Sequence, residues 1–413
     1  MDSEFQGKRL LYKSSLILSA EVFHNLVSVV ILFFITRKYL PYDIGIYLFA
    51  FSFTELFLII VSFGSGRFLM REIARDKTKT AKYLGNIFGL RVLFSLICLV
   101  LLLGITGVFF KQAILMTAIV SVPLIINQVT FIFSSIFYAH GKIFYAIFVG
   151  ISSRTLLILL FFPFLKLDLD IIYLPTIHIL SSIYFFTVSC FIQQNKITRF
   201  RLEIDLKFWG EILKKCLPFL ILGISSMIYF KLDTIMISKI RGFEEAAFYD
   251  SPLRIITALL FIPYSFFPIV YPGLSQLIDK KSHFRNMYKR VLKQLITISC
   301  VLTLFFFFFS KFIIGFLFGE EFFNSWKVLS ILSLSIPFIF INTLNTVSFL
   351  SINREKEVIY ILTAVVLVKI ILNLFFIPPY GFIAGAVTTL ITAILLLFCL
   401  NLFLYKYYWR EPH

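Results

Sequence analysis

Charged side chains are scarce in this sequence of 413 residues. They make up 15% of it, whereas hydrophobic residues make up 59% and Phe alone occupies 53 positions. A water-soluble globule of this size needs far more polar surface than such a composition supplies. The scarcity of charge therefore excludes a soluble protein and indicates a chain that crosses a membrane many times.

Motifs for catalysis and for nucleotide or metal binding are also missing. The sequence has no GxxxxGK[ST] loop, no HExxH and no GxSxG, so we expect no ATP-driven pump, no catalytic residues, no cofactor and no metal. Asp168 and Asp170 form a DxD motif, but we expect them in a short outer loop, away from cytosolic nucleotide-sugars. The five cysteines lack CxxC or Cys–His spacing and are expected to act as small apolar side chains.

The apolar residues gather in twelve stretches of about 20 residues or more, the length that a membrane-spanning helix needs. We expect the first six spans near 14–36, 44–66, 83–108, 112–138, 143–165 and 169–194. We expect the second six near 212–238, 245–272, 289–310, 324–350, 356–378 and 381–405. The sequence thus predicts an all-α membrane protein with one lobe at 1–194, a basic cytoplasmic linker at 195–211 and a second lobe at 212–413.

A short repeat relates the two halves. The segment KLDTIMISKIRGFEEAAFYDSPLR, at 231–254, matches the chain 202 positions earlier, so that Lys239 corresponds to Arg37 and Tyr249 to Tyr47. Internal repeats of this kind are typical of transporters. Because an even number of spans separates equivalent helices, we expect two six-helix lobes related by a pseudo-twofold axis along the membrane normal.

Lys and Arg are distributed unevenly between the predicted loops. Of the 39, 26 lie in or beside one set of alternating loops and the termini, and 7 lie in the other set. This bias predicts that both termini are cytoplasmic. It also accounts for the net charge of +17 through topology and contact with anionic lipids, without a nucleic-acid partner.

Two cations lie near the middle of equivalent spans. Arg154 is about 11 residues into the fifth span, or about 16 Å deep. Arg154 precedes Pro163 by nine residues, and Lys369 precedes Pro378 by the same nine. Facing each other across the axis, these cations would line a central cavity; alternatively, each neutralises a carboxylate such as Glu55 and fastens helices.

Cations outnumber carboxylates within the spans, which favours an anionic substrate because charge moved through a low dielectric needs compensation. The candidate substrate-binding residues are Arg154, Lys369, Arg91, Lys231 and Arg254. The candidate ion-coupling residues are Glu55, Glu21 and Asp233, whose alternative role is to bond a neighbouring helix. For Arg91 the alternative is a side chain that reaches back to the interface, and for Arg254 it is neutralisation by Asp250, four residues earlier on one helical face.

Three segments together resemble a known family: ITRKYLPYDIGIY (35–47), FGSGRFLMREIARD (63–76) and YFKLDTIMISKIRGFEEAAFYDSPLRI (229–255). They are similar to the bacterial O-antigen and capsule repeat-unit flippases of the multidrug/oligosaccharidyl-lipid/polysaccharide exporter superfamily. Glu244 and Glu245 depart from the family pattern, which often has a glycine in that turn.

The resemblance implies a fold like that of the multidrug exporters, with lobes that alternate between inward-open and outward-open states. It implies transfer of an undecaprenyl-pyrophosphate-linked oligosaccharide from the cytoplasmic to the periplasmic leaflet of the bacterial inner membrane. Expected partners are that lipid-linked oligosaccharide, membrane lipids, a polysaccharide polymerase and a chain-length regulator. A cation-coupled small-molecule exporter of the same fold is an alternative, as is a membrane-embedded polymerase, although the large outer loop typical of such enzymes is missing.

The charge bias makes the topology testable. Reporter fusions at Lys111, Lys166 and Arg241 are expected to report the outer side of the membrane, because these residues belong to the loops poor in Lys and Arg. A cytoplasmic signal at any one of them would overturn the predicted topology.

Overall fold

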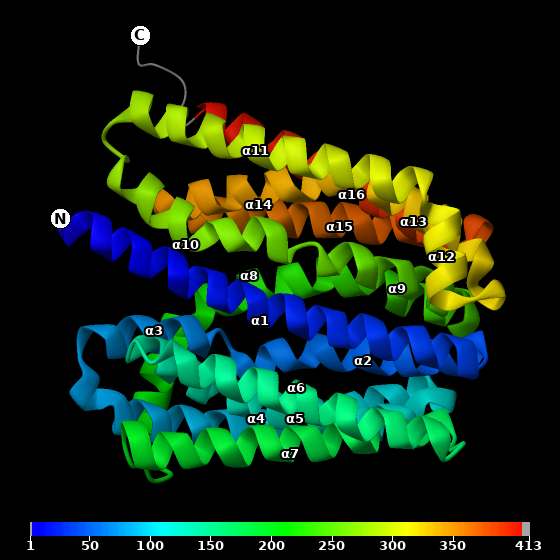
Figure 1. Ribbon diagram of the computed structural model, residues 1–413, viewed down its shortest axis with the longest axis horizontal. Helices are drawn as coiled ribbons and strands as arrows, with labels where there is room; N and C mark the ends of the chain where they lie inside the picture. The colour runs from blue at the N-terminus through cyan, green and yellow to red at the C-terminus, as the bar shows by residue number, and fades with distance from the viewer. Residues whose placement is uncertain (1, 407–413) are drawn as a thin grey trace. The chain divides into compact units, whose positions relative to one another are not determined.

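The computed structural model describes residues 2–406, and the regular elements of this part of the chain are helices (Figure 1). The first-half helices are α1 (Asp2–Lys38), α2 (Pro41–Ser62), α3 (Ser65–Arg75), α4 (Thr80–Phe109), α5 (Ile114–Ala139), α6 (Ile143–Lys166) and α7 (Leu174–Ile192). The second-half helices are α8 (Leu206–Ile240), α9 (Phe243–Ala258), α10 (Phe261–Gln276), α11 (Lys281–Phe308), α12 (Ser310–Phe318), α13 (Trp326–Ser333), α14 (Ile336–Ser351), α15 (Glu355–Tyr380) and α16 (Phe382–Leu404).

The number of possible spans agrees with the sequence. Eleven spans within the described residues are long and apolar enough to cross a membrane, and the bent pair Glu320–Ser333 and Ile336–Ser351 makes twelve if it is counted as one span. This pair, bent by 45°, coincides with the span expected near 324–350. Pro337, at the start of α14, explains the break because proline has no backbone N–H to continue the preceding helix.

The helices form two compact units. The first-half unit contains Ser19–Ile31 and Ile46–Lys231, and the second-half unit contains Met1–Leu18, Leu32–Gly45 and Leu232–His413. The boundaries between units therefore fall inside α1, α2 and α8, and the linker at 195–211 lies wholly in the first-half unit. The division into lobes at 194 and 212 stays a prediction.

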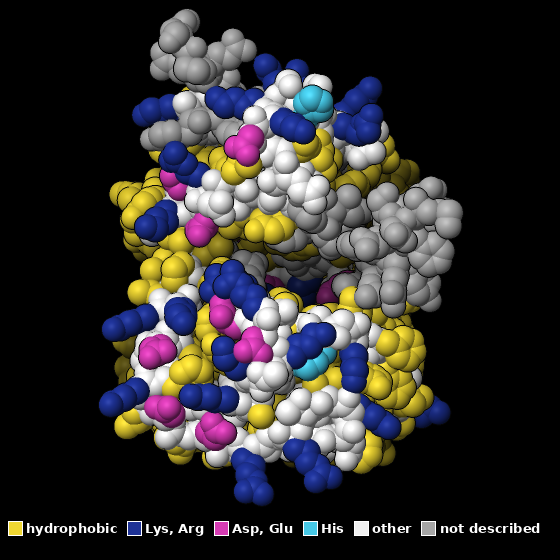
Figure 2. Space-filling model, turned by 90° about the vertical axis from the view of Figure 1, so that its left-hand side faces the viewer, with side chains coloured by type: hydrophobic (Ala, Val, Ile, Leu, Met, Phe, Trp, Pro, Cys, Tyr) yellow, Lys and Arg dark blue, Asp and Glu magenta, His cyan; other side chains and the backbone are white. Residues whose placement is uncertain are grey.

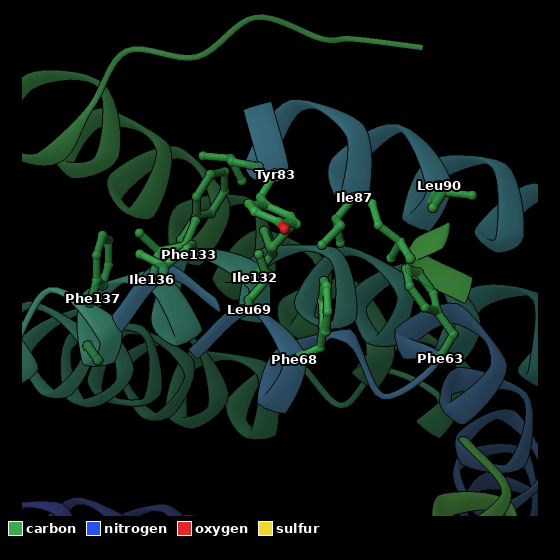
Figure 3. Close-up of a cluster of buried hydrophobic side chains, with 14 of the residues drawn as sticks. Phe63, Phe68, Leu69, Tyr83, Ile87, Leu90, Ile132, Phe133, Ile136 and Phe137 are labelled. Carbon is green, nitrogen blue, oxygen red and sulfur yellow. The ribbon is translucent and has the colours of Figure 1, made fainter. Parts of the chain in front are cut away.

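The first-half unit has a core of large apolar side chains between α3, α4 and α5 (Figure 3). On α4 its members recur at helical spacing, as do those on α5, so each helix presents one apolar stripe to the other. The labelled members are Phe63, Phe68, Leu69, Tyr83, Ile87, Leu90, Ile132, Phe133, Ile136 and Phe137. This packing fixes the helices that carry Arg91 and its partners.

The linker is bound to α4 rather than loose. The Asn86 side chain donates to Glu203 Oε2 (3.0 Å), and its carbonyl oxygen accepts from the Asp205 backbone N–H (3.0 Å) and from Trp209 Nε1 (3.1 Å). One residue earlier, a Cβ added to Gly85 would overlap the backbone carbonyl of Arg201. Glycine is therefore required where the linker crosses α4.

The end of the first-half unit that Figure 2 shows carries many Lys and Arg side chains. The helix α3 lies at this end in Figure 1, and its Arg71 and Arg75 are exposed. Both belong to a loop that the charge bias predicts to be cytoplasmic. The orientation of this end toward the cytoplasm stays a prediction.

The linker contact predicts opposite effects for two glycines in helices. Gly85→Ala is expected to lower the melting temperature of the purified protein by several degrees, because relief of the overlap costs about 1–3 kcal/mol. Gly150→Ala on α6 is the control, since nothing lies within 4 Å of its added Cβ and alanine favours a helix by up to about 1 kcal/mol. Equal melting temperatures for the two variants would contradict the close linker contact.

Candidate functional site

Arg154 on α6 meets polar side chains of α1 within the first-half unit. Its Nη2 lies 3.4 Å from His24 Nε2, and since arginine only donates, this imidazole nitrogen is the acceptor. Glu21 lies one turn before His24 on α1 and interacts electrostatically with Arg154. Arg154 is partly exposed, and no Asp or Glu oxygen of the described residues lies within 4.0 Å of it. Its charge is therefore not neutralised by a direct ion pair.

Lys369 on α15 has a different environment in the second-half unit. Its Nζ lies 2.7 Å from Asp233 Oδ2, and both side chains are only 1% exposed. The same oxygen accepts from the hydroxyl groups of Tyr249 (2.6 Å) and Thr389 (3.0 Å). The other carboxylate oxygen accepts from Asn373 Nδ2 (2.6 Å). The lysine thus neutralises a buried carboxylate that joins α8, α9, α15 and α16.

Two further ion pairs are partly exposed. Lys231 Nζ lies 2.6 Å from Glu55 Oε2, with side chains 23% and 33% exposed. Arg254 Nε lies 2.8 Å from Asp250 Oδ2 on α9, and Thr234 donates to the other oxygen of that carboxylate (2.8 Å). The spacing of four residues thus predicted the pair of Arg254 and Asp250 correctly. Glu55, by contrast, is paired with Lys231 and not with Arg154 or Lys369.

Arg91 on α4 is buried, with 2% of its surface exposed. Its Nε and Nη2 donate to Ser65 Oγ (3.2 and 2.9 Å), and its Nη1 donates to the backbone carbonyl of Gln128 (2.6 Å). The side chain therefore points into the unit and ties α3, α4 and α5 together, rather than reaching back to the membrane surface. Among the described residues, no group of three or more His, Cys, Asp or Glu side chains could hold a metal ion.

Comparison with known sequences decides the family. The model of the family described as "Polysaccharide biosynthesis protein" matches residues 10–278, which is more than half of the chain. The chain belongs to this family. A relative from Shigella flexneri, named "Putative O-antigen transporter", is 29% identical over 173 residues, and the match covers 41% of this chain and 40% of the relative. The family expected from the sequence motifs is confirmed.

Solved structures share the fold of this polysaccharide biosynthesis protein. An inward-facing multidrug resistance transporter of the MATE family, in the MOP superfamily, is 14% identical and has a TM-score of 0.74, with 95% of this chain and 98% of that chain covered. The lipid II flippase MurJ in an inward closed conformation is 21% identical, with a TM-score of 0.72 and coverage of 94% and 87%. At these identities the matches show the fold alone, and they confirm the all-α, MATE-like fold class.

The carboxylate that neutralises Lys369 has no counterpart in the first-half copy of the repeat. At the offset of 202, Asp233 of the second half corresponds to Ile31 of the first half, and Tyr249 corresponds to Tyr47. The first half therefore has no carboxylate at the position that neutralises Lys369. Arg154 has no such carboxylate beside it, although Arg154 and Lys369 each precede a proline by nine residues.

Sequence reasoning did not assign roles to several residues that complete these clusters. Tyr249, Asn373 and Thr389 all bond to Asp233, and His24 accepts from Arg154. For His24 a signal was present, since it follows Glu21 by about one helical turn in an otherwise apolar span. No local pattern indicates that Thr389 lies near Asp233, because 156 residues separate them.

The Glu55–Lys231 pair gives a test of its structural role. Glu55→Gln and Lys231→Met are each expected to lower the melting temperature, because each leaves one charge without its partner. The double variant is expected to recover part of the loss, with a coupling free energy of about 1 kcal/mol or more in a double-mutant cycle. Strictly additive losses would show that the pair contributes no stability.

Proposed function

We propose that this protein is a flippase, not an enzyme, for undecaprenyl-pyrophosphate-linked repeat units of an O-antigen, capsule or exopolysaccharide. It carries them from the cytoplasmic to the periplasmic leaflet of the bacterial inner membrane by alternating access, with both termini cytoplasmic. Membership of the polysaccharide biosynthesis family supports this proposal, as does the name of the Shigella flexneri relative. A polymerase and a chain-length regulator are the proteins expected to act on the delivered units.

The observation that carries the proposal is the unneutralised charge of Arg154. A pyrophosphate that crosses a low-dielectric region needs an opposite charge close to it. A guanidinium supplies that charge permanently and donates two parallel hydrogen bonds that fit phosphate oxygens. Because Arg154 is partly exposed and its nearest described polar contact is His24, it can bind an anion without breaking an ion pair. The sequence places it close to the membrane midplane.

The other four candidate cations have weaker claims to the substrate. Lys231 and Arg254 are partly exposed, so they can approach phosphate oxygens, but each would share its charge with Glu55 or Asp250. Arg91 and Lys369 are buried against protein groups and have almost no surface to offer. We therefore assign Arg154 as the principal phosphate ligand and Lys231 and Arg254 as secondary ones.

Glu21 is the carboxylate best placed for ion coupling. It is exposed, and it makes no ion pair within the described residues, whereas Glu55 and Asp233 are each held by a lysine. A charged Glu21 competes with an anionic substrate for the attraction of Arg154, so protonation of Glu21 strengthens the binding of an anion. Glu21→Gln is thus expected to weaken the pH dependence of transport, measured as the ratio of rates at two pH values. An unchanged ratio would remove Glu21 from the coupling step.

Genetic complementation tests the proposal. A deletion strain is expected to accumulate lipid-linked repeat units in its inner membrane, measured by mass spectrometry, and the wild-type gene is expected to clear them. Arg154→Ala is expected to reduce export about tenfold or more at a normal protein level, because loss of a charge-assisted contact costs about 1.5–3 kcal/mol. Arg154→Lys is expected to retain part of the activity, since a cation remains.

Lys166→Ala, at the exposed end of the same helix, is the matched control and is expected to behave as wild type. A deletion strain without accumulated repeat units would overturn the flippase, and loss of resistance to cationic drugs instead would favour the small-molecule exporter. If Arg154→Ala exports at the wild-type rate, the assignment of Arg154 as phosphate ligand is wrong, whereas the flippase function is not contradicted.

A further inference from the structure

The cluster around Asp233 brings together polar side chains from four helices. The carboxylate of α8 is surrounded by the hydroxyl groups of Tyr249 on α9 and Thr389 on α16 and by the side-chain amide of Asn373 on α15. The carbonyl of that amide accepts in turn from Thr388 (2.6 Å). Asn373 turns its Nδ2 toward Asp233, so the groups here that resemble ligands of a hard cation such as Na⁺ are the carboxylate and the hydroxyl oxygens of Tyr249 and Thr389.

The position that such a cation would take next to the carboxylate is occupied by the chain itself. The ammonium group of Lys369 lies 2.7 Å from Asp233 Oδ2. An ammonium is a compact point charge, which makes lysine a closer substitute for a metal cation than the planar guanidinium of arginine. With both side chains 1% exposed, neither charge is left to water, and removal of either would leave the other buried and unpaired.

We propose that Lys369 is a tethered cation that fills a cation site in the second-half unit and makes this unit independent of external Na⁺. The sequence assigned Asp233 to ion coupling and Lys369 to the substrate. In the structure they form one neutral ion pair that holds four helices together. Coupling to an external ion then has to act elsewhere, and a change at position 369 creates an open cation site. The proposal does not depend on the identity of the transported substrate.

Thermal unfolding of the purified full-length protein tests this inference. The melting temperature is measured with rising NaCl at constant ionic strength, balanced with choline chloride. The wild-type protein is expected to show no Na⁺-specific change. Lys369→Ala is expected to be less stable in choline and to show a saturable rise of about 2 °C or more with Na⁺, as expected for a ligand that binds only the folded state.

The Asp233→Asn/Lys369→Ala variant is the matched control, and it is expected to lose the Na⁺ effect because the carboxylate is gone. A saturable Na⁺ effect in the wild-type protein that Asp233→Asn abolishes would overturn the proposal, because Na⁺ would then bind beside Lys369. Folded Lys369→Ala without any Na⁺ effect would overturn it as well. If Lys369→Ala does not fold, the neutral pair Asp233→Asn/Lys369→Met is expected to fold, and the wild-type titration still decides whether Na⁺ enters.

Discussion

A charge inside a membrane protein must be neutralised by an opposite charge, solvated, or reserved for a ligand. This constraint determines how the polar residues of the structure are arranged. An unpaired buried charge costs several kcal/mol, so the chain places an opposite charge next to most of its intramembrane carboxylates. Lys231 neutralises Glu55, Arg254 neutralises Asp250 and, most deeply buried, Lys369 neutralises Asp233. Arg91 is held instead by a hydroxyl and a backbone carbonyl.

The first-half unit contains two charged side chains, Arg154 and Glu21, that make no direct ion pair within the described residues. Arg154 and Glu21 interact electrostatically without a direct ion pair, and Arg154 contacts His24, which follows Glu21 by three residues on α1. The internal repeat makes this asymmetry plain, because Ile31 stands where the second half has Asp233. The first-half cation therefore contacts a neutral imidazole acceptor, whereas Lys369 in the second half neutralises a carboxylate that holds its helices together.

Much of the fold follows from the sequence for simple physical reasons. Long apolar stretches must become helices in a membrane, since backbone groups have no water to bond there, and so the spans could be located. The Asp250–Arg254 pair could be found because its members are four residues apart on one helix. Lys369 and Asp233 could not be matched in the same way, because 136 positions separate them and helix packing alone brings them together. Arg91 shows the same limit, since a single helix does not reveal which of its faces meets a neighbour.

Translocation by the purified protein in lipid vesicles tests the central claim most directly. The measurement follows a labelled, pyrophosphate-linked lipid oligosaccharide and the fraction of it that a membrane-impermeant reagent cannot reach. With the wild-type protein this protected fraction is predicted to fall as lipid from the inner leaflet reaches the outer one, whereas with Arg154→Ala the fall is predicted to be slower by about tenfold or more. Equal protection with and without the wild-type protein would contradict the account.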